Sequence, residues 1–358
     1  MGIVVKVMLD FYKNKKVFIT GHTGFKGTWL CYALLDAGAD LTGYALEPLE
    51  NTALFYQIGL GKKMRSVIAD IRSRDKLIQV MSEAKPDVVF HLAAQPLVRH
   101  SYLEPALTYE TNVMGTVNIL EAVRITPSIK SFVNITTDKV YENKEWHWGY
   151  RENENLCGFD PYSNSKSCSE LVTYSYRNSF FFDKDTPAIS TARSGNVIGG
   201  GDYSDSRIIP DCVRAAVSGK DIVVRNPCSV RPYQHVLDCL SGYLLLAEKQ
   251  YSDKTLESAY NFGPDDESCV TTGALAELFC KAWGQGAAWR VQGDDGPHEA
   301  NFLKLDCSKA KAVLGWKPKW DIKTAVEKTV EFARAGTDDE RLACIDRQIN
   351  KYFGVHNV

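Results

Sequence analysis

The chain has 358 residues, of which 44% are hydrophobic and 24% are charged, and its formal net charge is −2. This composition is typical of a globular protein with one large or two coupled domains, and it excludes intrinsically disordered, collagen-like and coiled-coil architectures. The near balance of 42 basic and 44 acidic residues predicts no nucleic-acid partner and no membrane surface as partner, so any phosphate-bearing ligand has to be met by local charges.

The N-terminal segment, residues 1–16, predicts neither a secretory signal nor a lipid anchor, because Lys6 interrupts its short apolar patch and three lysines follow that patch. No run approaches the roughly 18 apolar residues that a membrane span needs. The ten cysteines contain no CxxC pair, and the histidines form no HExxH motif. We therefore expect reduced thiols that serve as small core residues, no metal site and a cytoplasmic protein.

Strand and helix signals alternate over roughly the first 190 residues. Six short runs rich in β-branched and aromatic residues predict strands at 16–20, 41–45, 65–70, 87–92, 131–136 and 188–192. Apolar residues at helical spacing predict helices at 28–37, from the third strand to residue 84, at 112–124 and at 163–178. This order predicts an α/β fold, a Rossmann-type doubly wound parallel sheet covered by helices.

The texture changes after Gly195, where glycines, prolines and isolated polar residues become frequent. Shorter signals predict strands at 222–225 and 258–262 and helices at 243–248, 272–283 and 322–335. A region this interrupted does not predict a second Rossmann unit. We expect a smaller C-terminal domain whose chain crosses back onto the sheet.

A glycine-rich loop with the spacing GxxGxxG lies directly between the first strand and the first helix. Glycines at these positions permit a tight turn and let the backbone approach a pyrophosphate at a helix N-terminus. The loop therefore predicts a dinucleotide site made by seven residues: Gly21, His22, Thr23, Gly24, Phe25, Lys26 and Gly27. The side chain of Lys26 either serves a phosphate or is simply solvated.

The adenosine half of a dinucleotide would lie at the ends of the second and third strands. Asp70, followed by Ile71, either holds the adenine amino group or caps the next helix. Glu47 either holds the ribose or is a loop residue. The segment from Asp40 to Gly61 contains no Lys or Arg, which disfavours a 2′-phosphate there and favours NAD as the cofactor.

A YxxxK motif, Tyr162 to Lys166, stands at the start of a predicted helix, where residues four apart share one face. A lysine ammonium held there is expected to lower the pKa of the tyrosine phenol, so that the phenol can act as a base near neutral pH. Thr137, Asp138 and Lys139 follow the fifth strand, at the edge where open parallel sheets bind ligands. The Thr137 hydroxyl can donate to the same substrate oxygen as the phenol.

These motifs together make nearly the whole chain resemble the extended short-chain dehydrogenase/reductase family. The segment His91 to Gln95 matches that family's fourth-strand signature, and the segments beginning at Arg193, Arg231 and Leu314 are similar to its nucleotide-sugar half. The resemblance implies an NAD-binding Rossmann domain of residues 1–190 plus about 232–262. It implies a nucleotide-sugar-binding domain of residues 191–231 and 263–358.

The resemblance also implies ligand contacts. For NAD it adds Leu92, Ala93, Ala94, Tyr162 and Lys166 to the glycine loop and Asp70-Ile71. For the nucleotide sugar it implies Gln95, Asn196, Arg207, Arg231 and His235. Arg231 is the expected pyrophosphate ligand, because its guanidinium can bind two oxygens at once. His235 is expected to orient neighbouring groups and not to transfer protons.

The two residues after Thr137 separate subfamilies within this resemblance. Nucleotide-sugar 4,6-dehydratases carry Asp-Glu there and epimerases carry small residues, whereas this chain has Asp138-Lys139. With the loop sequence GHTGFKG, this departure implies a lyase that removes water from CDP-glucose. Asp138 would be the acid at C6, and Lys139 either the base at C5 or a charged group that stabilises the enolate.

Three other functions remain open from the sequence. They are a nucleotide-sugar 4-epimerase or 4-reductase, a dehydratase of another nucleoside diphosphate glucose, and a non-catalytic NAD-binding scaffold. Asp138 argues against an epimerase, and the intact Thr137, Tyr162 and Lys166 argue against a scaffold.

The resemblance further implies a homodimer built on helices 112–124 and 163–178, or a homotetramer. The implied pathway is dideoxyhexose synthesis for cell-surface polysaccharide such as lipopolysaccharide O-antigen.

Overall fold

The computed structural model describes residues 9–48, 52–293 and 300–354, so the first half of the N-terminal segment discussed above lies outside the described residues. Its centre is a sheet of seven parallel strands in the order β11-β6-β5-β4-β1-β2-β3. The strands are β1 (Lys16–Thr20), β2 (Asp40–Ala45), β3 (Arg65–Ile68), β4 (Val88–His91), β5 (Ser131–Ile135), β6 (Ala188–Ser194) and β11 (Ala259–Phe262). All six strands predicted for the first 192 residues are confirmed. The strand predicted at 258–262 is β11, which adds to the sheet edge beside β6.

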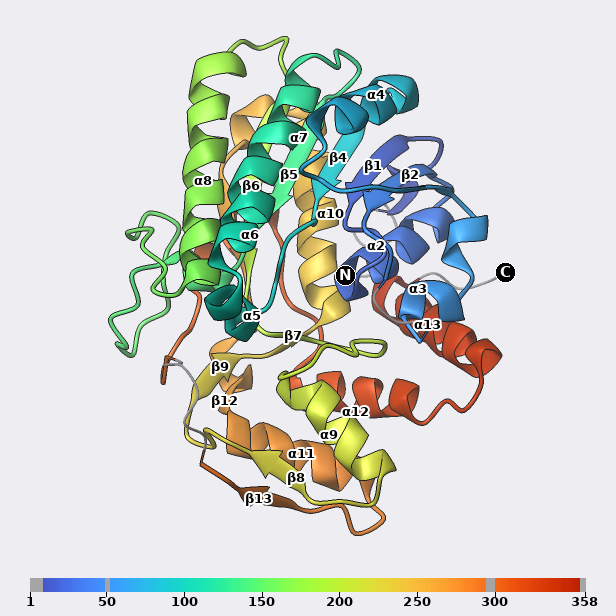
Figure 1. Cartoon of the computed structure of the whole chain (residues 1–358), viewed down its shortest axis with the longest axis vertical. Helices are drawn as coiled ribbons and strands as arrows, with labels where there is room; N and C mark the ends of the chain where they lie inside the picture. Colours follow the sequence, from blue (N-terminus) through green and yellow to red (C-terminus); the bar gives the residue numbers. More distant parts are fainter. Residues whose placement is uncertain (1–8, 49–51, 294–299, 355–358) are drawn as a thin grey trace.

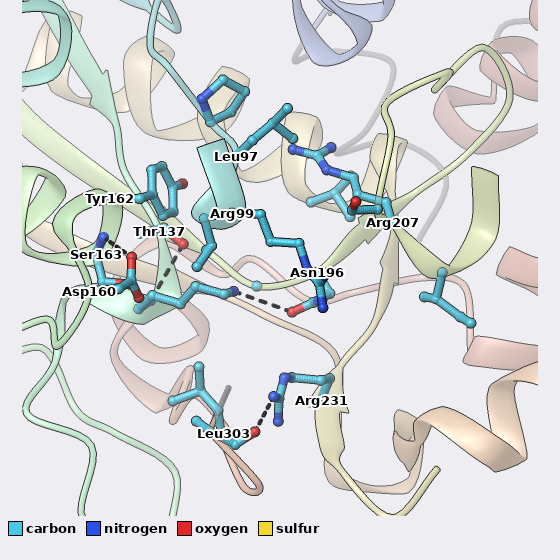
Figure 2. A pocket seen from close by; sticks show the side chains of 18 of the residues that line it. Leu97, Arg99, Thr137, Asp160, Tyr162, Ser163, Asn196, Arg207, Arg231 and Leu303 are labelled. Atoms are coloured by element: carbon cyan, nitrogen blue, oxygen red, sulfur yellow. Dashed lines mark hydrogen bonds between the residues drawn. The ribbon is translucent and has the colours of Figure 1, made fainter. Parts of the chain in front are cut away.

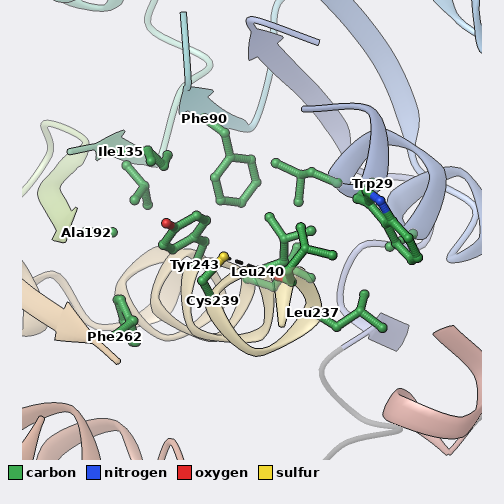
Figure 3. Close-up of a cluster of buried hydrophobic side chains, with 14 of the residues drawn as sticks. Trp29, Phe90, Ile135, Ala192, Leu237, Cys239, Leu240, Tyr243 and Phe262 are labelled. Atoms are coloured by element: carbon green, nitrogen blue, oxygen red, sulfur yellow. Dashed lines mark hydrogen bonds between the residues drawn. The ribbon is translucent and has the colours of Figure 1, made fainter. Parts of the chain in front are cut away.

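Helices cover both faces of this sheet, so the predicted doubly wound α/β fold is confirmed (Figure 1). On one face pack α2 (Phe25–Asp36) and α10 (Val236–Ser252), which share a hydrophobic cluster with the central strands. Figure 3 shows part of this cluster, with Leu240 and Tyr243 of α10 facing Phe90 and Ile135 of the sheet. On the other face α4 (Arg74–Ala84), α7 (Gly115–Arg124) and α8 (Pro161–Phe180) line a second cluster.

A smaller unit lies beyond the C-terminal edge of the strands, in the lower part of Figure 1. A third hydrophobic cluster holds it together, with side chains from α9 (Ile208–Val217), β8 (Ile222–Val224), α11 (Thr272–Trp283) and α12 (Ile322–Ala333). Three strand pairs complete it: β8 with β13 (Trp289–Val291), β9 (Val230–Pro232) with β12 (Cys269–Thr271), and β7 (Val197–Ile198) with β10 (Gln234–His235). Among the described residues, no helix combines the length and apolarity that crossing a membrane requires.

Two differences from the expected elements have clear local causes. The helix predicted at 243–248 is the middle of α10, which starts at Val236 because the Nδ1 atom of His235 accepts a hydrogen bond from the backbone of Leu237. The C-terminal α13 (Asp338–Phe353) was not predicted, although Thr337 and Glu340 form a reciprocal capping box at its start.

Candidate active site

The glycine loop joins β1 to α2, and two of its glycines are required by close backbone packing. Gly21 has a φ of +75°, and a Cβ atom there would lie 2.8 Å from the backbone nitrogen of Ala93. A Cβ atom on Gly27 would lie 2.1 Å from the carbonyl oxygen of Gly21. Gly24 is the N-cap of α2 and has no side chain to cover the first turn. The loop therefore presents bare backbone at a helix N-terminus, which fits a dinucleotide pyrophosphate.

His22 and Thr23 fix the loop against the end of β2. The Thr23 hydroxyl donates to the carbonyl of Leu46 at 2.9 Å, and the His22 Nε2 atom lies 2.7 Å from the Ser66 hydroxyl. The His22 ring occupies the space left by Gly43, where a Cβ atom would lie 2.4 Å from the ring. Burial lowers the pKa of His22 to about 4, so the ring is neutral at physiological pH. The His22 side chain therefore holds the loop against β2 and β3 and is directed away from the expected pyrophosphate site.

The residues expected at the adenosine half lie at the predicted edge of the sheet. The Asp70 carboxylate accepts hydrogen bonds from the backbone of Arg72 at 2.8 Å and from its guanidinium at 2.7 Å, which hold the pKa of Asp70 below its usual range. Asp70 is not the N-cap of α4, because that position is Ser73. Glu47 is exposed after β2 and accepts a hydrogen bond from the Tyr56 hydroxyl.

The edge after β4 is tied to the first strand. The backbone N–H groups of Leu92 and Ala93 each donate to the Thr20 hydroxyl oxygen at 3.1 Å, and Ala94 follows them. Ile71 is buried, and its side chain is the neighbour that a Cβ atom on Gly115 of α7 would meet at 3.0 Å. These contacts fix the end of β4 against the end of β1, and the residue after Asp70 against α7.

Thr137, Tyr162 and Lys166 meet beyond the end of β5. The Asp160 carboxylate caps α8 by accepting from the backbone of Ser163 at 2.9 Å, which fixes Tyr162 in the first turn. One turn later, the Lys166 ammonium donates to the carbonyl of Ile135 at 3.1 Å, at the last residue of β5. Figure 2 shows the side chains of Tyr162 and Thr137 next to each other at one wall of the cavity. The predicted catalytic group is thus assembled at the C-terminal edge of the sheet.

The protonation of this group differs from the expectation. Burial raises the pKa of Tyr162 to about 12, against a smaller lowering by the Thr137 hydroxyl. Burial, followed by the charge of Lys26, lowers the pKa of Lys166 to about 7. In the protein alone the pKa of the phenol is therefore raised and not lowered as predicted, because burial outweighs the hydrogen bond from Thr137.

Asp138 and Lys139 are in direct contact. The Lys139 ammonium donates to the Oδ1 atom of Asp138 at 2.9 Å, and the Thr137 hydroxyl donates to the same atom at 3.0 Å. The Asp138 side chain is fully buried, and its Oδ2 atom has no hydrogen-bond partner among the residues that the structure describes. Lys139 also reaches the Asn196 side-chain oxygen at 3.5 Å. An acid and an amine therefore lie side by side next to the Thr137 hydroxyl.

A cavity of about 1150 Å³ opens between this edge of the sheet and the smaller unit. Its walls include Thr137, Lys139, Tyr162, Asn196, Arg207 and Arg231 (Figure 2). Arg231 is 7% exposed and donates to the carbonyl oxygens of Val230, at 3.0 Å, and of Ala300. Arg207 pairs with the nearly buried Asp202 at 3.1 Å. Lys26, Arg99 and Arg225 also line the cavity, together with acidic side chains such as Asp160, Asp205 and Asp211.

Two residues expected to contact the nucleotide sugar lie elsewhere. His235 is fully buried between the rings of Trp29 and Trp320, where it caps α10, and burial lowers its pKa to about 3. The Gln95 amide is used by its own loop, accepting from Leu97 at 2.6 Å and donating to Thr108 at 2.9 Å. Neither residue belongs to the cavity wall. Helix capping and loop closure, which sequence spacing did not reveal, explain both positions.

One buried pair that supports the site was not predicted. Glu170 of α8 and Arg193 of β6 are each 3% exposed and form two hydrogen bonds of 2.9 Å. Glu170 lies four residues after Lys166, as Lys166 lies four after Tyr162, so continued i, i+4 spacing was the available signal. Among the described residues, no three His, Cys, Asp or Glu side chains are grouped as metal ligands would be.

Comparisons with known proteins agree with this geometry. Residues 18–329 match the family model described as GDP-mannose 4,6 dehydratase. The chain is 46% identical over 350 residues to a CDP-glucose 4,6-dehydratase of Salmonella typhimurium, covering 96% of this chain and 98% of that protein. The epimerase Mth375 of Methanothermobacter thermautotrophicus has a TM-score of 0.79 at 20% identity, covering 97% and 98% of the two chains. A dTDP-glucose 4,6-dehydratase of Streptomyces venezuelae, solved with NAD and TYD bound, has a TM-score of 0.76 at 22% identity, covering 89% and 97%.

Proposed function

The chain belongs to the GDP-mannose 4,6 dehydratase family, within the extended short-chain dehydrogenases/reductases, and we propose that it converts CDP-glucose to CDP-4-dehydro-6-deoxyglucose and water. The observation that carries this proposal is the contact between Lys139, which with Thr137 lines the cavity, and Asp138, which is buried directly behind them. The 46% identity with a CDP-glucose 4,6-dehydratase supports the choice of CDP as the nucleotide.

NAD is the proposed cofactor, and when bound it accepts a hydride from C4 of the sugar and returns it to C6. The bare backbone of Gly21, Gly24 and Gly27 fits its pyrophosphate, and the residues after β3 and β4 would hold its adenosine half. We assign NAD binding to residues 1–190 plus about 232–262, and nucleotide-sugar binding to residues 191–231 and 263–358. The return of α10 and β11 to the sheet supports this division.

The side chains divide the remaining steps among them. Tyr162 takes the proton of the C4 hydroxyl, while Thr137 donates a hydrogen bond to the same oxygen. Lys139, in its neutral form, removes the C5 proton once C4 is a ketone. Asp138 then protonates the C6 hydroxyl, which leaves as water. The buried Oδ2 atom of Asp138, which has no partner among the described residues, supports this role, because a proton on it would have no competing acceptor there.

The diphosphate of the substrate would be met by the cations that line the cavity. Arg231 and Arg207 are held in place by a backbone carbonyl and by Asp202, so their remaining N–H groups are pre-oriented. Asn196, linked to Lys139, lies between Arg207 and Arg231 in Figure 2. These two arginines would supply the positive charge for the diphosphate, which the net charge of −2 does not supply.

Product analysis with four nucleotide sugars tests the proposal. The enzyme should be incubated with the glucose conjugates of CDP, dTDP, UDP and GDP, and the products followed by the alkali-induced chromophore of 4-keto sugars and by the NMR signal of a new C6 methyl group. We expect both signals with CDP-glucose and neither with a Tyr162→Phe variant. A galactose product would favour an epimerase, faster turnover of another conjugate would correct the nucleotide, and silence with all four would refute the dehydratase.

We further propose a cytoplasmic homodimer or homotetramer that acts in deoxysugar synthesis for cell-surface polysaccharide such as O-antigen. Large apolar side chains on the two expected helices support the assembly: Met114, Leu171 and Tyr174 are 51%, 52% and 61% exposed. Sedimentation equilibrium should give a dimer or tetramer for the wild type and for the control Val217→Glu. It should give a smaller species for the double variant Leu171→Glu/Tyr174→Glu. A wild-type monomer at micromolar concentration would contradict the assembly.

A further inference from the structure

Residues 137–139 form one short turn after β5, the catalytic turn, which carries the hydroxyl donor, the acid and the base of the proposed reaction. Hydrogen bonds from buried side chains anchor it on both sides. Before the turn, the Thr136 hydroxyl donates to the carboxylate of Glu170 on α8. After it, the Tyr141 hydroxyl donates to the side-chain oxygen of Asn261 on β11 at 2.7 Å. All four of these side chains are buried, so water does not compete for either hydrogen bond.

The guanidinium of Arg193 on β6 connects the two anchors. Its Nε and Nη2 atoms each donate to the Glu170 carboxylate at 2.9 Å, and its Nη1 atom donates to the Tyr141 hydroxyl at 2.8 Å. Nη1 also donates to the backbone carbonyl of Glu152 at 3.0 Å, in the loop that joins the turn to α8. These hydrogen bonds spread over a planar fork, whereas a lysine ammonium has its donors at a single point. One side chain thus joins both sides of the catalytic turn.

The contacts within the catalytic turn do not fix its place in the cavity wall. Thr137 faces the cavity (Figure 2), and Lys139 lines it as well. The two hydrogen bonds that the Asp138 carboxylate accepts both come from these neighbours, so they fix the three side chains relative to one another only. Where the turn as a whole lies depends on contacts outside it. Arg193 joins two of those contacts, although it does not line the cavity itself.

The ion pair of Arg193 with Glu170 is not explained by stability alone, because apolar side chains of similar volume often replace a buried ion pair without loss. Placement gives a stronger reason, since a displacement of about 1 Å near the chemistry can cost about 10²-fold in rate. We propose that Arg193 is a positioning residue of the dehydratase, which fixes the catalytic turn against the cavity by binding Glu170 and Tyr141 at once. The inference rests on the function proposed above.

The two anchors support different steps of that reaction. Thr136 is adjacent to Thr137, which serves C4 oxidation, whereas Tyr141 is two residues after Lys139, the proposed base at C5. Loss of the Tyr141 hydroxyl leaves the Thr136 anchor intact and should therefore slow elimination more than oxidation. Reduced dinucleotide would then accumulate, because the hydride leaves C4 faster than C6 becomes able to receive it.

The test compares Tyr141→Phe with the control Tyr352→Phe, each of which removes a buried hydroxyl that has two side-chain partners. The Tyr352 hydroxyl, on α13, donates to Asp238 at 2.7 Å and lies 3.1 Å from the Ser241 hydroxyl. We expect Tyr141→Phe to lower kcat by about 10- to 10²-fold, to leave KM for CDP-glucose within about twofold of wild type, and to accumulate the near-ultraviolet absorbance of reduced dinucleotide. Tyr352→Phe should keep the wild-type kcat.

A second measurement, on Arg193→Lys, does not depend on turnover. The lysine keeps a positive charge for Glu170 but has no fork with which to hold Tyr141 as well. Amide hydrogen exchange, followed by mass spectrometry, should become faster than in wild type in the peptide that covers residues 136–141. It should stay at the wild-type rate in the peptide that covers β1, because Arg193 has no part in holding that strand.

The inference is overturned if kcat of Tyr141→Phe stays within about twofold of wild type, or if Tyr352→Phe loses as much. It is also overturned if the loss appears in KM, if no reduced dinucleotide accumulates, or if exchange over residues 136–141 does not rise in Arg193→Lys. A wild-type enzyme that is inert toward all four glucose conjugates would instead refute the proposed dehydratase, which separates the two failures.

Discussion

At the scale of single residues, the proposed chemistry depends on the contact between Asp138 and Lys139. An epimerase needs no acid at C6, whereas a dehydratase needs a base at C5 and an acid at C6 within reach of one sugar ring. The two side chains are 2.9 Å apart, and the Thr137 hydroxyl shares the same carboxylate oxygen. In the proposed mechanism, a single buried carboxylate therefore connects the group that serves oxidation to the group that serves elimination.

Substitution of the two residues should separate proton removal from water loss. Lys139→Met should abolish exchange of the C5 hydrogen with deuterated solvent, whereas Asp138→Asn should retain exchange but lose water release. We expect kcat to fall by about 10²–10⁴-fold in each variant, the range for loss of an acid or base. NMR of the sugar in deuterated water follows both events.

The control for this pair is Lys144→Met, which removes an exposed lysine from the same segment. It should keep wild-type turnover and exchange. If Lys139→Met turned over at the wild-type rate, neither the base nor the electrostatic role of Lys139 would stand. If Asp138→Asn still released water, the acid would have to be another group.

Residue identities in the site were predictable from the sequence, but their protonation was not. Thr137, Tyr162 and Lys166 follow from motif and strand position, and the structure brings all three to one edge. The pKa of Tyr162, about 12, depends on how completely the surrounding elements bury it, which only packing determines. The same limit applies to His235, whose place in the core follows from the start of α10 and two tryptophans from distant segments.

At the scale of elements, the junction between β1 and α2 depends on backbone contact with no room for side chains. We expect Gly27→Ala to weaken NAD binding by about 10²-fold, the effect of a 1 Å displacement at a binding site, because the added methyl group would push the loop from its place. Its Cβ atom would lie 2.1 Å from the Gly21 oxygen. Isothermal titration with NAD measures the change.

A matched glycine gives the control for that experiment. A Cβ atom on Gly293 would meet none of the described atoms within 4 Å. Gly293→Ala should therefore bind NAD as the wild type does. Equal affinity in both variants would show that the loop tolerates a side chain and does not hold the pyrophosphate by close approach.

The attachment of α8 to β6 is the second element-scale feature with a measurable consequence. Arg193→Met would leave the 3% exposed Glu170 carboxylate without its charged partner, which costs about 3–5 kcal/mol of unfolding free energy. The double variant Glu170→Gln/Arg193→Met should be less destabilised than that, because no charge remains buried. Urea titrations of the two single variants and the double variant give the coupling energy.

An exposed pair calibrates this measurement. Glu154→Gln removes a partner of Arg151, whose side chain is 64% exposed, and should change the unfolding free energy by less than about 1 kcal/mol. If Arg193→Met were as mild as Glu154→Gln, the Glu170–Arg193 pair would not be what fixes α8 on the sheet.

The elements that could be predicted from the sequence are those whose apolar pattern has clear boundaries in the sequence itself. The six strands of the first 192 residues are short apolar runs bounded by turns, and all were found. By contrast, α9 was not predicted although its apolar residues have helical spacing, because it follows a stretch rich in glycine and polar residues and carries Pro210 in its first turn. Its apolar side chains pack against those of α11 and β8.

At the scale of the whole molecule, three fully buried histidines make stability depend on pH. Burial lowers the pKa of His22 to about 4 and those of His91 and His235 to about 3. The unfolded chain takes up these protons near pH 6.5, whereas the folded chain does not until the lower values are reached. Stability conferred by the neutral rings is thus present above about pH 6.5 and is lost as the pH falls toward the folded values.

When the pH falls from 6.5 to 5, the free energy of unfolding should decrease by about 2 kcal/mol for each buried histidine, at 1.36 kcal/mol per pH unit. Urea titrations at several pH values should show this loss in the wild type. The His91→Asn variant should lose about 2 kcal/mol less over that interval, and the exposed His147→Asn should behave as wild type. Identical pH profiles for His91→Asn and wild type would contradict the neutral buried ring.

The return of the chain to the sheet also sets an order for biosynthesis. The β6 edge is covered only when β11, Ala259–Phe262, has left the ribosome, because β11 pairs with β6 across the whole intervening excursion. The last helix, α13, contacts elements made much earlier. Asp346 of α13 accepts a hydrogen bond from Tyr32 of α2 at 2.5 Å, and Tyr352 of α13 donates to Asp238 of α10 at 2.7 Å. A nascent chain released early would carry an open sheet edge, the feature that invites aggregation. Premature stop codons near the 3′ end of the message should therefore be as damaging as those in the middle.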